Sequence, residues 1–148
     1  MEVQILQTNN LADFKELISV FEVVFEMNDF QAPEDSHLQR VLNNENFLVF
    51  IARADEKIVG GLTVYVLDQY YSEKPLAYIY DLAVLTDCQR KGVGRKLIAF
   101  TNDYCRSSGF QEVFVQADKI DDYAIEFYRK TLPAIEEETV QFSYDLLK

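Results

Sequence analysis

The chain has 148 residues, 49% of them hydrophobic and 14% aromatic, which excludes a disordered protein and predicts one domain over residues 1–148. No apolar run approaches the roughly 20 residues of a membrane span, and the N-terminus lacks the basic flank and apolar core of a signal peptide, so we expect a cytoplasmic protein without a membrane partner. The net charge of −11 argues against nucleic-acid binding, which requires a broad basic surface.

The chain offers few ligands for a metal ion. It has two cysteines, one histidine and no C-x-x-C pair, so we expect no metal site. Cys88 lies next to the glycine-rich turn described below, where a nucleophilic thiol has to be considered. No histidine lies near it in sequence to activate it, and we favour a reduced thiol without a catalytic role.

The first third of the chain predicts a strand followed by two helices. Val3 and Ile5 alternate with polar residues, as in a short strand. Apolar residues then recur at helical spacing over residues 11–25. The pattern breaks over residues 27–33, and Pro33 is well placed to start a second helix.

Acidic residues dominate the stretch over residues 16–35, which includes most of the first helix, the break after it and the start of the second helix. It contains no base and six acids, which are Glu16, Glu22, Glu26, Asp29, Glu34 and Asp35. Such a surface attracts a cationic substrate and speeds its encounter with the protein. The alternative is a solvated surface that only confers solubility. We assign Glu26 and Asp29 from this group to substrate binding.

The middle third predicts a hairpin and a third long strand. An apolar run over residues 47–52, a turn, and a second run over residues 58–67 form the hairpin, with Gly60 and Gly61 marking a bulge. The third strand covers residues 76–84. Asp81 is the only acid within it, and an acid among apolar residues is costly unless a partner or a task retains it.

A glycine-rich turn, Q-R-K-G-V-G over residues 89–94, connects this strand to an amphipathic helix over residues 92–108. Such a turn gathers free backbone N–H groups at the positive end of a helix, where phosphate binds readily. It lacks both the hydroxyl of a P-loop and the third glycine of a dinucleotide fingerprint. Four of the fourteen bases lie in residues 90–96, which favours a polyanionic cofactor. The alternative is an ordinary turn that contains two glycines.

The last third predicts two strands and a helix. Residues 112–117 alternate as a strand next to the one that holds Asp81. Asp121 and Asp122 start a short helix, which Pro133 ends. Residues 139–146 predict a last strand, and a short additional strand is considered near residues 134–136. The whole order predicts an α+β fold in which helices cover both faces of a mixed sheet.

The pattern Q-x-x-G-x-G after an apolar strand resembles the acyl-CoA pyrophosphate loop of the GNAT superfamily of N-acetyltransferases. The order of elements resembles the whole GNAT fold, a mixed, mostly antiparallel sheet with a V-shaped splay between two parallel central strands. Y-I-Y-D-L-A-V, V-Q-A-D and D-D-x-A-x-x-x-Y-x-K are similar to segments of the aminoglycoside 3-N-acetyltransferases that modify gentamicin. The chain departs from that family after Lys130, where T-L-P replaces L-G, and near its end, where F-S-Y-D-L replaces H-F-D. These departures concern the acceptor more than acetyl transfer.

The resemblance implies a site for acetyl-CoA. Backbone N–H groups of the turn would hold the pyrophosphate, and the glycines would permit its close approach. Backbone groups at the end of the third strand would pair with the pantetheine arm where the parallel strands splay apart. The cofactor-binding residues expected from the resemblance are Leu82, Ala83, Val84, Gln89, Arg90, Lys91, Gly92, Val93, Gly94, Arg95 and Lys130. For Arg90, Lys91 and Lys130, an exposed position without a ligand is the alternative.

Two residues are candidates for the chemistry. Acetyl transfer to an amine needs a neutral nitrogen, so a base must first take a proton from the ammonium form, and Asp81 is our candidate. The resemblance makes Tyr128 the acid that protonates the leaving thiolate. The alternatives are a structural aspartate bonded to a neighbouring turn and a tyrosine that fills the core. The N–H of Val84 is a candidate oxyanion donor, and direct transfer in a ternary complex is expected.

The acceptor implied by the resemblance is a polycationic small molecule, first of all the 3-amino group of an aminoglycoside. Asp118 and Asp122 would bind its ammonium groups, unless they serve only as helix caps. A polyamine, another metabolite amine or a protein N-terminus are alternative acceptors, and a non-catalytic acyl-CoA-binding module is a third kind of protein. A homodimer is a further candidate, because Tyr70, Tyr71 and Phe142 would suit an interface.

Overall fold

The computed structural model describes residues 1–147, which form a five-stranded sheet, four α-helices and one 3₁₀ turn. The described chain divides into two units, Met1–Gln116 and the residues from Ala117 onward. The elements of the first unit are β1 (Glu2–Ile5), α1 (Leu11–Val24), α2 (Asp35–Asn43), β2 (Phe47–Ala54), β3 (Lys57–Leu67), β4 (Leu76–Val84), η1 (Thr86–Cys88), α3 (Val93–Ser107) and β5 (Glu112–Val115). The second unit contains α4 (Asp122–Lys130). A single domain over residues 1–148 stays a prediction.

The sheet belongs entirely to the first unit. Its strands follow the order β1-β2-β3-β4-β5, and every neighbouring pair is antiparallel except β4 and β5, which are parallel. The expected α+β architecture with a mixed, mostly antiparallel sheet is therefore confirmed. Residues 112–115 form β5, which is two residues shorter than the strand expected there.

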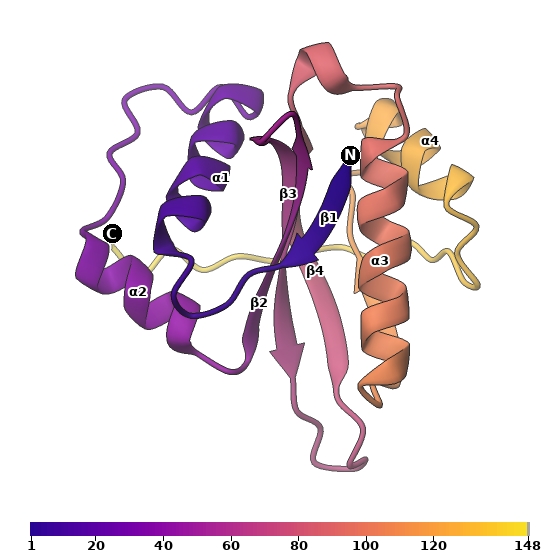
Figure 1. Ribbon diagram of the computed structural model, residues 1–148. Helices are drawn as coiled ribbons and strands as arrows, with labels where there is room; N and C mark the ends of the chain where they lie inside the picture. Colours follow the sequence, from indigo (N-terminus) through magenta and orange to yellow (C-terminus); the bar gives the residue numbers. More distant parts are fainter. Residues whose placement is uncertain (148) are drawn as a thin grey trace. The chain divides into compact units, whose positions relative to one another are not determined.

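Helices cover both faces of this sheet (Figure 1), with α1 and α2 on one face and α3 on the other. The strand β2 is apolar from Phe47 to Ala52, where both of its faces are largely buried. Val49 and Ile51 belong to the cluster that α1 and α2 cover. Phe50 points to the opposite face, where its ring meets Phe100 and Tyr104 of α3 at centroid distances of 5.9 and 5.5 Å.

Gly61 is required by the close approach of α1 to the sheet. A Cβ at this position would lie 2.6 Å from both Leu17 Cδ1 and the carbonyl oxygen of Phe50. The bulge expected at the glycines lies one residue earlier, because Ala52 pairs with Gly60 but Arg53 pairs with Ile58. Gly60 and Gly61 are therefore needed for close packing more than for the bulge.

The C-terminal segment differs from the prediction. No strand lies within residues 131–147 of the described chain, so the strands expected over residues 139–146 and near residues 134–136 are not formed. Alternating apolar residues indicate that a segment suits a half-buried strand, but the strand forms only where a sheet edge supplies hydrogen-bond partners. In the single chain no strand of the sheet pairs with this segment, and β5 remains an edge strand.

Candidate active site

One edge of β4 is open along its second half. The pairing of β4 with β3 continues from Leu76 to Val84, whereas the pairing with β5 ends where Ile79 meets Val115. From Tyr80 onward, the β5-facing edge of β4 has no strand partner in the described sheet. The splay expected between the two parallel strands therefore lies at these residues.

The register shows which backbone groups face this open edge. The N–H of Leu85 donates to the carbonyl of Val59 at 2.8 Å, so Gly60 and Val84 form a pair without mutual hydrogen bonds. The N–H and C=O groups of Val84 consequently point away from β3. By the same alternation the backbone N–H and C=O groups of Leu82 point to the open edge, and those of Ala83 point to β3. Of the three residues expected to pair with an extended ligand, Leu82 and Val84 have the required orientation.

A bulge in β4 holds Asp81. Leu62 pairs with Leu82 and Val64 pairs with Ile79, so β4 spans three steps where β3 spans two. The extra residue falls at Tyr80 and Asp81, and the N–H of Asp81 donates to the side-chain hydroxyl of Thr63 at 3.3 Å. Bulges often redirect a side chain next to an active site.

The Asp81 carboxylate is half-buried and has neither an ion-pair nor a hydrogen-bond partner among residues 1–147. Burial raises the pKa of this carboxyl above its ordinary value because water no longer solvates the charged form fully. A raised pKa makes the carboxylate a better proton acceptor near neutral pH. The alternative of a structural aspartate bonded to a turn finds no such bond in the described structure.

Tyrosines next to Asp81 were missed by the sequence analysis. The rings of Tyr65 and Tyr80 meet edge to face at 5.5 Å, and Tyr78 lies 5.9 Å from Tyr80. Burial, followed by the charges of Tyr80 and Asp81, raises the pKa of the Tyr65 phenol. Tyr78 and Tyr80 could have been noticed from their alternation, but Tyr65 joins them through cross-strand register. A carboxylate beside exposed aromatic rings can bind a cation.

The turn after β4 is fixed to the end of that strand. The side-chain amide of Gln89 donates to the carbonyl oxygen of Val84 at 2.9 Å. This oxygen is the group that the register directs away from β3. Gln89 therefore positions the turn against the open edge, and its expected contact with a cofactor stays a prediction.

Left-handed residues direct the backbone of this turn. Arg90 has a φ of 61° and Gly92 a φ of 85°, on either side of Lys91. Alternation of this kind turns successive N–H groups toward one side and creates an anion-binding concavity. A Cβ at Gly92 would meet nothing within 4 Å, so glycine is required there by its conformation and not by crowding.

The turn leads directly into the N-terminus of α3. The first intrahelical bond runs from the N–H of Lys96 to the carbonyl of Gly92, at 3.0 Å. The N–H groups of Val93, Gly94 and Arg95 therefore precede the helical ladder and remain for a ligand or water. The side chains of Arg90, Lys91, Arg95 and Lys96 are exposed around them. The role of the N–H groups of residues 90–95 in binding a phosphate stays a prediction.

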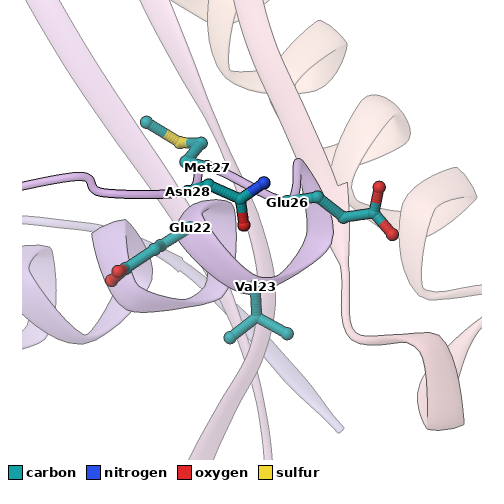
Figure 2. A pocket seen from close by; sticks show the side chains of 5 residues that line it. All are labelled: Glu22, Val23, Glu26, Met27 and Asn28. Carbon is teal, nitrogen blue, oxygen red and sulfur yellow. The ribbon is translucent and has the colours of Figure 1, made fainter.

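The acids near the end of α1 divide into two groups. Glu16 accepts a hydrogen bond from the N–H of Ile58 at 2.8 Å, and Asp35 pairs with Lys15 at 2.8 Å, so both have structural partners. Glu22 and Glu26 instead border an open surface hollow of about 700 Å³, together with Val23, Met27 and Asn28. Figure 2 shows that the two carboxylates extend to opposite sides of this hollow.

Glu26 and Asp29 adopt an unusual backbone conformation. Their φ angles are 51° and 59°, in the left-handed region that favours glycine. The N–H of Met27 donates to Glu22 O and that of Glu26 to Val23 O, at 3.0 and 3.3 Å, which is the Schellman arrangement that glycine usually completes. A glutamate in this position costs about 1 kcal/mol or more relative to glycine. Such strain suggests that the side chain is retained for a task.

The remaining predicted residues lie in the second unit, on α4 or next to it. Asp121 is the residue that caps α4, since its carboxylate accepts a bond from the N–H of Ala124 at 3.0 Å. Asp118 and Asp122 are exposed and are not the capping side chains. Tyr128 is half-buried on α4 with its ring 5.0 Å from that of Phe127, and Lys130 is exposed. The structure does not relate these four residues to the open edge of β4.

Other chemistries find little support in the described residues. No group of three or more histidine, cysteine, aspartate or glutamate side chains in residues 1–147 could hold a metal ion. No helix in that range is long and apolar enough to cross a membrane. Cys105 is buried, and burial raises the pKa of its thiol to about 11, so it remains protonated near neutral pH.

Comparison with known proteins identifies relatives of this chain. The sequence model of the Acetyltransferase (GNAT) family matches residues 14–132. The protein "Probable N-acetyltransferase camello" of Xenopus laevis is 30% identical over 97 residues, which make up 62% of this chain and 43% of that protein. The chain thus aligns with less than half the length of this curated relative.

Solved structures give a longer match. The aminoglycoside acetyltransferase meta-AAC0020, from an uncultured soil metagenomic sample, was solved in complex with trehalose; it is 59% identical, with a TM-score of 0.96 over 98% of this chain and 95% of that one. Its complex with sisomicin is 58% identical over the same shares of the two chains, with a TM-score of 0.97. The aminoglycoside N-acetyltransferase AAC(6')-Iy in complex with CoA is 16% identical, with a TM-score of 0.74 over 97% and 98% of the two chains, a likeness of fold alone.

Proposed function

This chain belongs to the acetyltransferase (GNAT) family, and we propose that it is an N-acetyltransferase that acetylates an amine of a polycationic small molecule, first of all the 3-amino group of an aminoglycoside. The observation that carries the proposal is the continuous run from Asp81 to Arg95. It joins a half-buried carboxylate, outward-facing backbone groups and a turn of convergent amides within fifteen residues.

The proposed donor is acetyl-CoA, which supplies a thioester with an activated acetyl group. The N–H groups from Arg90 to Arg95 are suited to hold its pyrophosphate, and the space beside Gly92 leaves room for close approach. The backbone groups of Leu82 and Val84 are suited to pair with the extended pantetheine arm. The exposed side chains of Arg90, Lys91 and Lys130 would add phosphate contacts, and no metal is needed.

The proposed mechanism is direct transfer in a ternary complex. Asp81 accepts a proton from the ammonium form of the acceptor, and the free amine then forms the N–C bond with the acetyl carbonyl. The outward N–H of Val84 donates to the oxygen that becomes negative as this bond forms. The C–S bond then breaks, and Tyr128 donates its phenolic proton to the departing thiolate. Burial raises the pKa of the Asp81 carboxyl, which supports its role as the base, and the role of Tyr128 rests on its place in the family motif.

The proposed acceptor is cationic because aromatic rings lie beside the proposed base and because further acids of the chain are available to bind ammonium groups. Tyr65 and Tyr80 present their rings next to Asp81, and Glu26 and Asp29 hold strained positions at the end of α1. These carboxylates are suited to bind additional ammonium groups of a polyamine-like molecule, as are the exposed Asp118 and Asp122 of the second unit. The relative meta-AAC0020, at 58% identity, was solved with sisomicin, which supports an aminoglycoside over a protein N-terminus.

An acceptor screen tests this proposal. The chain is incubated with acetyl-CoA and each of gentamicin, sisomicin, spermidine and a peptide with a free N-terminus, and thiol release is followed. We expect turnover on the two aminoglycosides, and two-dimensional NMR of the product should locate the acetyl group on the 3-amino nitrogen. Turnover on spermidine or the peptide without turnover on either drug would reject the acceptor. Release of the CoA thiol before acceptor is added, with the acetyl group retained covalently on the enzyme, would reject the ternary-complex mechanism.

We place this reaction in the cytoplasm, where the sequence predicts the protein to be. We also propose a homodimer.

A further inference from the structure

Two threonines have buried side chains in a core that is otherwise apolar. Thr63 of β3 is 6% exposed and Thr101 of α3 is fully buried, and they are the buried polar residues of the described chain. The hydroxyl of Thr101 has no hydrogen-bond partner within residues 1–147, whereas that of Thr63 accepts a bond from the N–H of Asp81 at 3.3 Å. Because burying a hydroxyl is costly unless it is bonded, this bond gives a reason for threonine at residue 63.

The register of the sheet places the Thr63 hydroxyl at the bulge of β4. Thr63 lies opposite Val49, which belongs to the cluster under α1 and α2, so its side chain points to the same face. On the side of β4, it lies where the register shifts between Leu62 and Val64. Valine has at least the strand preference of threonine and would fit this apolar face. The hydroxyl is therefore the feature that distinguishes the residue found there.

The Asp81 carboxylate depends on its backbone for its position. No side-chain hydrogen bond or ion pair within residues 1–147 holds the carboxylate itself. The side chain of aspartate is short, so a shift of the main chain moves the carboxylate with it. A bulge leaves one residue outside the regular ladder, and here the Thr63 hydroxyl supplies an acceptor for the N–H of Asp81. The branched Thr63 side chain has little freedom about χ1, which keeps that acceptor in place.

We infer that Thr63 is a positioning residue for acetyl transfer, whose hydroxyl fixes the bulge of β4 and thereby holds the Asp81 carboxylate in place for the acceptor amine. The inference rests on the proposed role of Asp81 as the base. Thr63 acts through Asp81 and exchanges no proton with the acceptor. A displacement of about 1 Å at a reacting group can cost a factor of about 10² in rate, so one hydrogen bond to the backbone of the base is enough to affect turnover.

Three single variants test the inference in thiol-release assays with acetyl-CoA and sisomicin. Thr63→Val removes the hydroxyl and keeps the shape of the side chain, Thr63→Ser keeps the hydroxyl, and Thr101→Val removes the buried hydroxyl that has no partner within residues 1–147. We expect Thr63→Val to lower kcat roughly 10- to 100-fold with the KM of both substrates unchanged. Thr63→Ser and Thr101→Val should keep most of the wild-type kcat. Wild-type kcat in Thr63→Val, or an equal loss in all three variants, would overturn the inference.

A double variant tests whether Thr63 acts through Asp81. If it does, Thr63→Val should cause no further loss of kcat when Asp81→Asn is already present, because the two changes remove one function. Losses that multiply would overturn the inference. The same set separates it from the proposed function. Wild-type kcat in Asp81→Asn would overturn the base and the inference together, whereas a loss in Asp81→Asn with wild-type kcat in Thr63→Val would overturn the inference alone.

Amide hydrogen exchange, measured by NMR, tests the contact without an assay of activity. In wild type and in Thr63→Ser, the Asp81 amide proton should exchange more slowly than that of Asp87, an exposed residue of η1. In Thr63→Val the Asp81 amide should exchange several-fold faster than in wild type. Equal exchange in Thr63→Val and wild type would overturn the inference. If Thr63→Val does not fold, exchange of Asp81 as fast as that of Asp87 in wild type would do so.

Discussion

Two of the turns in the first unit that contain left-handed residues other than glycine, the turn after β4 and the turn at the end of α1, differ in the groups that they present. In the turn after β4, Arg90 and Gly92 orient backbone N–H groups, and the side chains lie around them. At the end of α1, Glu26 and Asp29 adopt a similar φ, but the backbone is used by the helix cap and the carboxylates project outward. The first turn suits an anion and the second a cation. Similar backbone conformations can therefore suit ligands of opposite charge.

The largest expected effect tests whether Asp81, on the strand that leads into the first of these turns, is the catalytic base. Asp81→Asn should lower kcat by about 10²–10⁴-fold, because the amide cannot accept the ammonium proton. Isothermal calorimetry should give an unchanged CoA affinity, since the turn over residues 89–95 is untouched. Asp87→Asn, an exposed acid of η1, is the matched control and should retain wild-type kcat. Equal kcat in the two variants would remove Asp81 from the mechanism.

A substitution at Gly92 tests whether the first turn acts through its backbone. Valine is disfavoured at a φ of 85°, so Gly92→Val should distort the amide array and weaken CoA binding about tenfold, as measured by calorimetry. Gly92→Asn is the control, because asparagine tolerates this conformation and nothing lies within 4 Å of the added Cβ. Comparable losses in both variants would show that the space beside Gly92, and not its conformation, is what matters.

A substitution at Glu26 tests the opposite expectation for the second turn. Glu26→Gly should raise the free energy of unfolding by about 1 kcal/mol, because glycine relieves the left-handed strain. The KM for the aminoglycoside should nevertheless increase several-fold, because one carboxylate is lost. Glu26→Asn should raise the KM as much as Glu26→Gly does, but it should raise the free energy of unfolding less. An unchanged KM in both variants, measured by thiol release, would remove Glu26 from substrate binding.

The smallest effect concerns stability as a function of pH. Because burial raises the pKa of Asp81 in the folded state, the folded protein disfavours the ionised carboxyl. Stability should be greatest below the pKa of the unfolded chain and should fall as pH rises through the folded pKa. In urea titrations, the free energy of unfolding of Asp81→Asn should therefore be larger than that of wild type at pH about 7 and equal to it at pH about 3. A variant less stable than wild type at neutral pH would indicate a bonded structural carboxylate.

The sequence predicted features that depend on local chemistry. Helical spacing located α1 and α3, and a glycine after Ser108 correctly marked the left-handed end of α3, where Phe110 N donates to Cys105 O at 3.0 Å. The turn over residues 89–94 was also predicted, because glycines and bases stand next to one another in the chain. Each of these features is determined by residues a few positions apart.

Features that depend on pairing between distant segments were not predictable. The extra residue at Tyr80 and Asp81 follows from the register of β4 against β3, and Tyr65 reaches the site through the same register. The strand predicted over residues 139–146 is absent because periodicity does not specify which edge will receive it. Glu26 gave no sign of its left-handed conformation, since no glycine occupies that position.

The bulge in β4 has an evolutionary consequence. Deleting one residue between Ile79 and Leu82 would restore an uninterrupted ladder, with Leu82 and Val84 still opposite Leu62 and Gly60. If the deleted residue were Asp81, the proposed mechanism would lose its base while the turn over residues 89–95 kept its sequence. On the proposed mechanism, the loss of a single codon would therefore convert a catalyst into a protein that only binds the cofactor.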